Sequence, residues 1–410
     1  MNATTSARPP RLAVVAHAES RRADLFAAAA AAAGLPPVRV VPWILVLRGV
    51  AEFRPGEWVR IDSPGEDRGV DWLLRGGDDP ARVEGSGRWY GRFVAAAREV
   101  SAAVAAAGGV SLDDPAELAV LFDKRLCHGL LRAAGVPVPE SPTSGTQAPP
   151  VRGWDDVRAL ARDAGMDRVF VKLAHGSSAS GVLAVQTAGG GRIRATTSVE
   201  RDERGRLFNS LRVRHYTDEA EVAAIVDTLA PDGLHIERWL PKASQDRRSA
   251  DLRVVVTEGR ATHAVLRTSR SPMTNLHLGG ARGDLAAARS AIERAGGDWG
   301  GALAICERAA ALFPSALRVG VDLLPLRGWR RFAVGEVNAF GDLLPGLMGL
   351  PGGGAEGLDT YGAQIAAVRA RAARAVPAGT ARTGPPSAAV APPSTAPSTA
   401  PRAGNERATG

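Results

Sequence analysis

The sequence predicts a mixed α/β protein, in which a short parallel unit precedes two larger α+β segments. Near the amino terminus an apolar run, an alanine-rich helical pattern and a second apolar run follow one another, as in a parallel α/β unit. Farther along, three pairs of apolar runs are joined by polar or glycine-containing turns and loops, which is typical of antiparallel hairpins. At 410 residues, 45% of them hydrophobic, the chain is long enough for several domains and a large core.

The first predicted domain covers residues 11–110 and follows a flexible amino terminus at 1–10. Its expected elements are a strand at 12–16, a helix at 24–33 ended by Gly34, a strand at 38–47 and a helix at 92–107. Between them lies a stretch rich in glycine and proline, 54–87, whose short apolar segments at 58–61 and 72–74 the sequence does not assign to elements.

The second predicted domain covers 111–240. Asp114 and Pro115 form an N-cap and a first helical position. The expected elements are helices at 118–122, 125–134, 154–164 and 218–229, a linker at 141–150, and strands at 169–171, 182–185, 193–197, 211–215 and 234–240. The Gly135-Val-Pro-Val-Pro139 segment stops the second helix and continues as extended chain.

The third predicted domain covers 241–376, and residues 377–410 form a Pro/Ala-rich tail that is expected to be disordered. The expected elements are a hairpin of strands 252–257 and 261–267, a loop at 268–283, helices at 285–295 and 299–313, a second hairpin of strands 317–324 and 331–337, and a helix at 356–375.

The hairpin at 168–185 is the most informative stretch. Its first strand ends in Lys172, and the loop that follows is made of small residues, Gly176, Ser177, Ser178 and Gly181 among them. Glycine and serine allow backbone N–H groups to approach an anion, and a lysine on the flanking strand adds a compact positive charge. The stretch is therefore interpreted as a loop that covers phosphates, with a mobile surface hairpin as the alternative.

Lysine usage favours the phosphate interpretation. Only three of the 51 basic residues are lysines, Lys124, Lys172 and Lys242, and the rest are arginines. In such a background a lysine is expected to be kept for its compact ammonium group rather than for charge alone.

A candidate metal site lies on the last pair of strands. Glu336 and Asn338 are two residues apart and therefore share a face of their strand, and a hairpin partner can bring Asp322 opposite them. Two carboxylates and an amide oxygen are hard ligands suited to Mg²⁺. The alternative is a polar sheet face in water, but the apolar neighbours of these acids argue for partial burial, where unpaired carboxylates are costly.

Composition narrows the function classes. No apolar run has transmembrane length, and the two cysteines, Cys127 and Cys306, lack metal or redox spacing, which predicts buried thiols in a cytoplasmic protein. The net charge is +8, but the arginines are scattered and only 5% of residues are aromatic, so nucleic acid is not favoured over a small acidic substrate. The sequence leaves open whether the chain forms a homodimer.

Taken in order, these motifs resemble the ATP-grasp superfamily of carboxylate–amine and carboxylate–thiol ligases, nearest to its peptide-glutamate ligase type. The resemblance runs from about residue 121 to 347. It is carried by Asp123-Lys124, by Val171-Lys172 with its loop, by Glu237-Arg238-Trp239-Leu240, by Asp251-Leu252-Arg253, by Arg267 with the 275–280 loop, and by Asp322, Glu336 and Asn338.

The resemblance implies an ATP-grasp fold, with an N-terminal α/β pre-domain and two α+β subdomains enclosing the nucleotide. It implies ATP and Mg²⁺ (or Mn²⁺) as cofactors, and a small-molecule or peptide carboxylate and an amine nucleophile as substrates. Lys124, Lys172, Arg253 and the loop would bind phosphates, and the metal would lie on Asp322, Glu336 and Asn338. The implied adenine hinge consists of Glu237 by its side chain and of Arg238, Trp239 and Leu240 by their backbone. Arg267 and Asn275 would be catalytic.

The sequence leaves open the ribose contact, the role of His277 and two rival functions. The acidic ribose ligand expected after the hinge has no clear counterpart, since Asp246 lies too far along, and Lys242 either serves there or is exposed to solvent. His277 is a candidate base, although a histidine beside a Gly-Gly turn is more often structural. A small-molecule kinase with the same ATP site and a basic nucleic-acid-binding protein remain rival functions.

Overall fold

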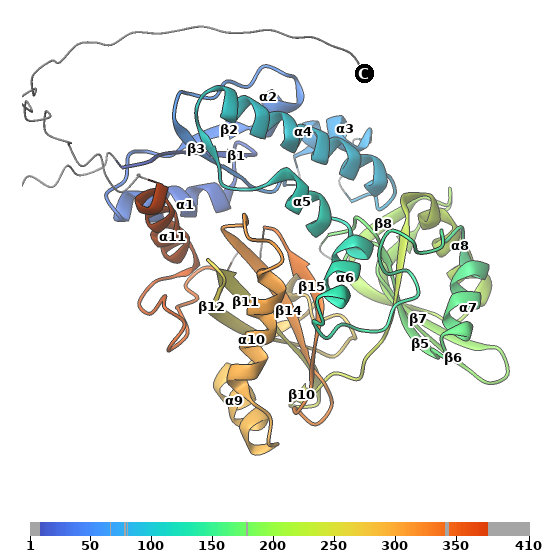
Figure 1. The fold of residues 1–410 in the computed structure, drawn as a ribbon. Coiled ribbons are helices and arrows are strands. Elements are labelled where there is room, and N and C mark those ends of the chain that lie inside the picture. The colour runs from blue at the N-terminus through green and yellow to red at the C-terminus, as the bar shows by residue number, and fades with distance from the viewer. Residues whose placement is uncertain are drawn as a thin grey trace, which may run out of the picture.

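The computed structural model describes residues 9–65, 67–77, 79, 81–177, 179–340 and 344–375, and for His277 the backbone only. The predicted tail, most of the predicted flexible amino terminus and Ser178 lie outside these residues. Within them the chain forms three sheets, each with its own helices (Figure 1).

The first sheet is parallel and has the order β2-β1-β3-β4. Its strands are β1 (Arg11–Ala16), β2 (Arg39–Pro42), β3 (Glu57–Ile61) and β4 (Val110–Ser111), and its helices are α1 (Arg21–Ala32), α2 (Trp43–Leu47), α3 (Arg68–Arg75) and α4 (Ser86–Ala106). The sheet is covered on one face by α1 and on the other by α2 and α4, which bury apolar residues of both faces in separate clusters. This is the predicted α/β pre-domain.

Two local predictions in this region need correction. The expected strand at 38–47 stops at Pro42, which lies in extended conformation at the N-cap of the short helix α2. Trp43 then turns inward and its indole N–H donates to the Asp62 carbonyl at 2.9 Å. The unassigned segment at 72–74 belongs to helix α3, which the Asp67 side chain caps and Gly76 ends at φ 85°.

The second sheet is antiparallel and has the order β8-β7-β6-β5-β9. Its strands are β5 (Arg168–Leu173), β6 (Leu183–Ala188), β7 (Arg192–Arg201), β8 (Leu207–Tyr216) and β9 (Leu234–Arg238). Helices α7 (Trp154–Asp163) and α8 (Glu219–Leu229) pack on one face and form an apolar core with it. Helices α5 (Pro115–Leu121) and α6 (Lys124–Ala133) connect the first sheet to this part of the chain (Figure 1).

The third sheet has the order β13-β12-β11-β14-β15, with β10 paired to β11. Its strands are β10 (Ser244–Gln245), β11 (Arg248–Thr257), β12 (Arg260–Ser269), β13 (Ala281–Arg282), β14 (Arg318–Pro325) and β15 (Phe332–Asn338), and its helices are α9 (Leu285–Arg294) and α10 (Trp299–Ala310). The predicted hairpins β11–β12 and β14–β15 form, and β14 pairs with β11 as well as with β15. This pairing brings the two hairpins into one sheet.

The last helix, α11 (Thr360–Ala375), returns to the first sheet. Its residues Tyr361, Ile365 and Val368 are buried with Leu12 and Phe26. Helix α11, the last element of the described residues, therefore packs against α1, as Figure 1 shows.

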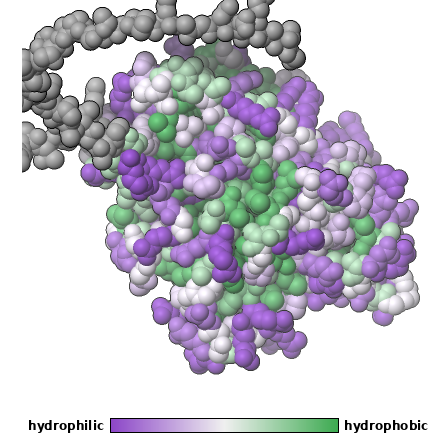
Figure 2. All heavy atoms as spheres, in the orientation of Figure 1, coloured by the Kyte–Doolittle hydropathy of each residue, from purple (hydrophilic) through white to green (hydrophobic). Residues whose placement is uncertain are grey.

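One face of the molecule carries both hydrophilic and apolar residues. Figure 2 shows hydrophilic residues over much of the visible face, with apolar residues gathered toward its middle. None of the helices in the described segments is both long and apolar enough to cross a membrane.

Candidate active site

A cleft lies between the second and third sheets, and the empty space in and above it, open solvent included, is about 800 Å³. Ten of the residues singled out from the sequence line it: Lys124, Lys172, Gly176, Glu237, Arg238, Leu240, Arg267, Asn275, Asp322 and Glu336. Apolar side chains, Phe170, Val182 and Met273 among them, line the same cleft. The cleft thus combines a charged part with an apolar part, as a site for a nucleotide would.

Lys172 and Glu237 form the first ion pair of the cleft. They lie on the adjacent strands β5 and β9, and Lys172 Nζ is 2.5 Å from Glu237 Oε1. Burial alone would lower the pKa of Lys172, but the carboxylates of Glu237 and Glu336 raise it above its ordinary value. Burial likewise opposes ionisation of Glu237, yet Lys172 and a hydrogen bond from His235 bring its pKa down to about 2. Both groups are therefore charged at neutral pH.

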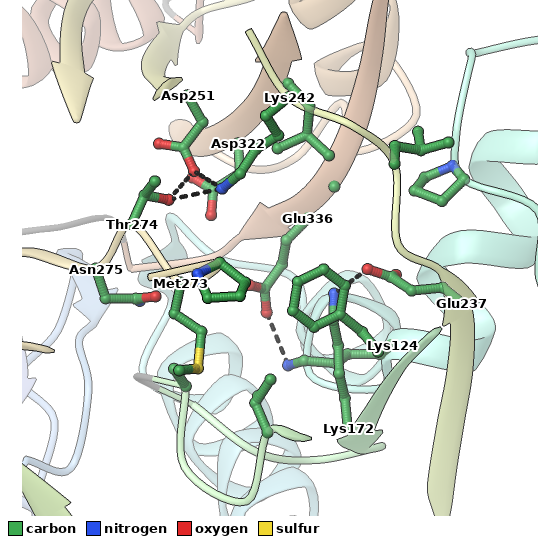
Figure 3. A pocket seen from close by; sticks show the side chains of 18 of the residues that line it. Lys124, Lys172, Glu237, Lys242, Asp251, Met273, Thr274, Asn275, Asp322 and Glu336 are labelled. Carbon is green, nitrogen blue, oxygen red and sulfur yellow. Dashed lines mark hydrogen bonds and ion pairs between the residues drawn. The ribbon is translucent and has the colours of Figure 1, made fainter. Parts of the chain in front are cut away.

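Lys124 forms the second ion pair. Asp123 caps α6 with its side chain, so Lys124 begins the helix, and its backbone N–H donates to the Ala174 carbonyl at 2.9 Å. Its ammonium group lies 2.7 Å from Glu336 Oε1 and donates to the Gly176 carbonyl at 2.5 Å. Figure 3 shows Lys124 and Lys172 reaching into the cleft toward the two glutamates. Lys124 therefore links the base of the small-residue loop to strand β15.

Asp322 is surrounded by arginines from two neighbouring strands. Arg253 Nε lies 2.8 Å and an Arg267 terminal nitrogen 2.9 Å from Asp322 Oδ1. Burial raises the pKa of Asp322, although both arginines act to lower it, and the nearby Asp251 and Glu336 raise it further. The carboxylate thus lies where neighbouring negative charge is already a cost, which a bound cation would relieve.

The three candidate metal ligands lie close together on one hairpin. Asp322 is paired with Glu336 and Gly320 with Asn338 in the β14–β15 register. The Asn338 amide donates weakly to the Gly320 carbonyl at 3.4 Å, and Asn338 does not line the cleft itself. In the described residues no three His, Cys, Asp or Glu side chains form a cage for a metal. Mg²⁺ does not require one, since it is commonly held by one or two carboxylates together with substrate phosphates.

The loop after Lys172 lies at the rim of the cleft. Gly176, Ala179 and Ser180 line it, whereas Ser177 and Gly181 do not. Gly181 has φ 69°, and a Cβ there would lie 2.6 Å from Leu173 Cδ1, so the return of the loop requires glycine.

The hinge residues differ from one another in their contacts. The Arg238 side chain points away from the hinge backbone and binds Glu140 at 2.6 Å, and its backbone N–H donates to the Glu140 carbonyl at 2.8 Å. The Trp239 N–H donates to the Arg168 carbonyl at 2.9 Å, and its ring lies under the Arg168 guanidinium, outside the cleft lining. Both N–H groups are therefore used within the protein, and Leu240 is the cleft-lining candidate for a backbone contact.

Asp251, Lys242 and Thr274 form a bonded group beside Arg267, and of these the sequence had not singled out Thr274. Asp251 accepts a bond from Arg267 Nε at 2.8 Å, and Lys242 Nζ lies 3.4 Å from Asp251 and 3.2 Å from the Thr274 hydroxyl. The Thr274 hydroxyl also donates to Asp251 (Figure 3). The Lys242 side chain is only 8% exposed, so the solvent-exposed alternative is wrong. The scarcity of lysine was the sequence signal for this position.

The predicted linker at 141–150 begins as part of the site's support. Thr143 is buried, and its hydroxyl accepts the Ile236 N–H at 2.8 Å, which fixes this segment against β9. His128 of α6 contacts the Pro139 carbonyl at 2.7 Å and the Ser144 hydroxyl at 2.8 Å. These bonds join the helix that carries Lys124 to the strand that carries Glu237.

Comparison with known proteins gives similarity at the level of structure only. No protein-family model matches the chain, and neither does any curated protein. The D-cycloserine synthetase DcsG superposes with a TM-score of 0.52 at 17% identity, covering 88% of this chain and 99% of DcsG. The ATP-grasp ligase PsnB with its minimal precursor (TM-score 0.49, 17% identity, 88% and 99% covered) and the D-alanine–D-alanine ligase of Bacillus anthracis with ATP (0.47, 11%, 89% and 98%) superpose less well and add no argument. The two α+β subdomains around one cleft, preceded by a parallel α/β unit, together with the match to DcsG identify the fold of this chain as the ATP-grasp fold.

Proposed function

We propose that this chain is an ATP-dependent ligase that activates a substrate carboxylate as an acyl phosphate and joins it to an amine or a similar nucleophile. The observation that carries the proposal is the arrangement of charge in the cleft. Lys124, Lys172 and Arg267 line the same cleft as Asp322 and Glu336, and each cation is paired with a cleft carboxylate. Such a cleft suits a polyphosphate that arrives with a divalent cation and takes the two lysines from their glutamates.

The first step of the proposed reaction is attack of the substrate carboxylate on the γ-phosphate. Lys124, Lys172 and Arg253 would hold the phosphates in line, which is the main contribution a protein makes to phosphoryl transfer. A magnesium or manganese ion held by Asp322, Glu336 and Asn338 would neutralise negative charge on the phosphates. Asp322 and Glu336 fit such an ion because they are paired on one hairpin and both line the cleft, whereas Asn338, two residues farther along, does not line it.

The second step is attack of the nucleophile on the acyl phosphate. Arg267 contacts Asp322 and also lines the cleft, so it is suited to stabilise negative charge on the tetrahedral intermediate. Asn275 lines the cleft, and in Figure 3 its side-chain amide points toward the middle of the cleft, which suits contact with a substrate. The substrate carboxylate belongs to a small molecule or a peptide.

The experiment that tests the proposal is analysis of nucleotide products. Full-length protein would be incubated with ATP, Mg²⁺ and pools of small carboxylic acids and amino acids, and the nucleotides separated by chromatography. We expect ADP and phosphate, formed only when a carboxylate and a nucleophile are both present. AMP and pyrophosphate would overturn the proposal in favour of adenylation, and ADP formed without a nucleophile would favour a kinase.

The binding of DNA separates the remaining rival. Retention on DNA that falls steeply with salt, without nucleotide turnover, would indicate a nucleic-acid-binding protein. The proposed ligase should be retained only weakly on DNA. Its ADP formation should not depend on added DNA.

A further inference from the structure

A buried histidine lies directly behind Glu237 and has no role in the reaction proposed above. His235 is 1% exposed and stands on β9 opposite Lys172 of β5. Its Nε2 is 3.5 Å from Glu237 Oε2, and its Nδ1 is 3.1 Å from the Thr143 hydroxyl. The other oxygen of Glu237 is the one that pairs with Lys172. Each Glu237 oxygen therefore has a partner of its own.

The neighbours of His235 select one form of its ring. Burial lowers the pKa of His235, and the charge of Lys172 lowers it further, so the ring is neutral although Glu237 acts in the other direction. A neutral imidazole donates from one nitrogen and accepts at the other. The carboxylate beside Nε2 can only accept, so Nε2 carries the hydrogen and Nδ1 accepts from the Thr143 hydroxyl. The result is a directed chain from Thr143 through His235 to Glu237.

The hydrogen bonds from Thr143 through His235 hold the carboxylate of Glu237 in one orientation in the cleft. A carboxylate has about four acceptor positions, and Lys172 and His235 occupy two of them. When a phosphate takes Lys172 from one oxygen, His235 still holds the other, so the side chain keeps its orientation in the cleft that Glu237 lines. An ionised, anchored carboxylate offers acceptors and no donor to whatever binds there.

We propose that His235, oriented by Thr143, is a positioning residue that keeps Glu237 an acceptor-only group and so makes the site selective for a base with an exocyclic amine. The inference rests on the proposed function, because it requires a nucleotide in the cleft. A 6-amino purine donates a hydrogen bond to such a carboxylate, whereas a 6-oxo purine presents a carbonyl oxygen that the carboxylate repels. An apolar residue at 235 would leave Glu237 one anchor short.

The test compares the equilibrium binding of ATP and of its 6-oxo counterpart ITP by titration calorimetry. The proteins are the full-length wild type, His235→Leu, which removes both ring bonds, and His235→Gln, whose amide can both donate to Glu237 and accept from Thr143. Wild type should prefer ATP by about tenfold to hundredfold, the range for a hydrogen bond to a charged group. His235→Leu should lose most of that preference by weakening ATP alone, and His235→Gln should keep more of it.

The outcomes separate the two levels of the argument. A protein that binds neither nucleotide overturns the proposed function and this inference with it. Wild type that binds ATP and ITP equally, or a His235→Leu variant that weakens both by one factor, overturns the inference while leaving the ligase proposal intact. Circular dichroism and melting of each variant show whether His235→Leu is folded. If it is not folded, the ratio of ATP to ITP affinity is measured instead for His235→Gln, Thr143→Val and Thr143→Ser. A positioning role predicts that, of the two Thr143 variants, only Thr143→Val reduces the preference for ATP.

Discussion

Asp322 lies directly opposite Glu336 in the β14–β15 pair, and each carboxylate is neutralised by cations from a different part of the chain. Arg253 and Arg267, on the strands β11 and β12, contact Asp322, whereas Lys124, at the start of α6, contacts Glu336. Two like charges held this close require such partners, since burial already disfavours their ionisation. The hairpin is thus prepared for a cation, and the first prediction concerns it.

Glu336→Gln should bind nucleotide but lose Mg²⁺-dependent turnover by roughly 10²-fold, the scale of one lost electrostatic contact in an active site. The substitution keeps the shape and removes one negative charge. Asp322→Asn should behave alike, and the double variant should lose much less than the sum because both residues serve one metal site. The measurement is the rate of ADP release against Mg²⁺ concentration.

A matched control is Glu140→Gln. It removes an exposed carboxylate that binds Arg238 but does not itself line the cleft. Its Mg²⁺ dependence should equal that of wild type. Normal Mg²⁺ dependence in Glu336→Gln would show that Glu336 is not a metal ligand.

Lys172→Met should affect both ATP binding and the stability of the free protein. The sequence indicates a phosphate contact for Lys172, and the structure adds that its side chain is only 13% exposed and paired with the buried Glu237. Removing one partner of a buried pair costs about 3–5 kcal/mol. Loss of a phosphate contact should weaken ATP binding by about 2–3 kcal/mol.

The double variant Lys172→Met with Glu237→Gln separates these two effects. Because no charge is then left unpaired, chemical denaturation should show recovery of much of the lost free energy of unfolding. ATP binding should stay weak, since the phosphate contact is still absent. Recovery of ATP binding along with stability would mean that Lys172 supports the fold only.

Arg267→Gln should separate binding from chemistry. Arg267 bridges Asp251 and Asp322, and in the proposed mechanism it stabilises the oxyanion rather than the nucleotide. Turnover should fall by about 10²–10³ while the Kd for ATP changes little. Arg267→Lys keeps the charge but lacks the planar guanidinium group that contacts two carboxylates. Its turnover should therefore lie between that of wild type and that of Arg267→Gln. An equal loss of ATP binding would instead assign Arg267 to the phosphate contacts.

The sequence predicted the fold class and the order of most elements because hydrophobic periodicity is a local property. The ATP-grasp resemblance is confirmed at the level of fold. Ten of the candidate residues line one cleft, whereas Ser177, Gly181, Trp239, Arg253 and Asn338 do not, and rare lysines were the strongest guide to it. Their roles stay predictions. The strand expected at 38–47 failed because Pro42 and the inward turn of Trp43 end it, which the apolar pattern alone does not reveal.

What the sequence could not give depends on contacts between distant segments. The N–H groups of Arg238 and Trp239 are occupied by carbonyls of Glu140 and Arg168, far away along the chain. The contact between the Thr143 hydroxyl and His235 is also between distant segments, and Thr143 lies in a stretch whose composition is that of a linker. Such partners follow from tertiary pairing of β9 with its neighbours, and no local pattern encodes them.

The last prediction concerns the pH dependence of stability. Burial, reinforced by the nearby His235, lowers the pKa of His128 from its ordinary value near 6.5 to about 4 in the folded protein. Between these values the unfolded chain binds a proton that the folded protein does not, so the free energy of unfolding should decrease as the pH falls from about 6.5 to 4. Above 6.5 the ring is neutral in both states and has no such effect. The contribution is at most about 3 kcal/mol.

In His128→Gln the acid dependence measured by urea unfolding at pH 7.5 and 4.5 should be shallower, although His175, His235 and His263, whose pKa values are also lowered, keep part of it. Because Gln at 128 also loses the bonds to Pro139 and Ser144 at every pH, the slopes are compared and not the absolute stabilities. Equal slopes in wild type and His128→Gln would show that folding does not change the pKa of His128.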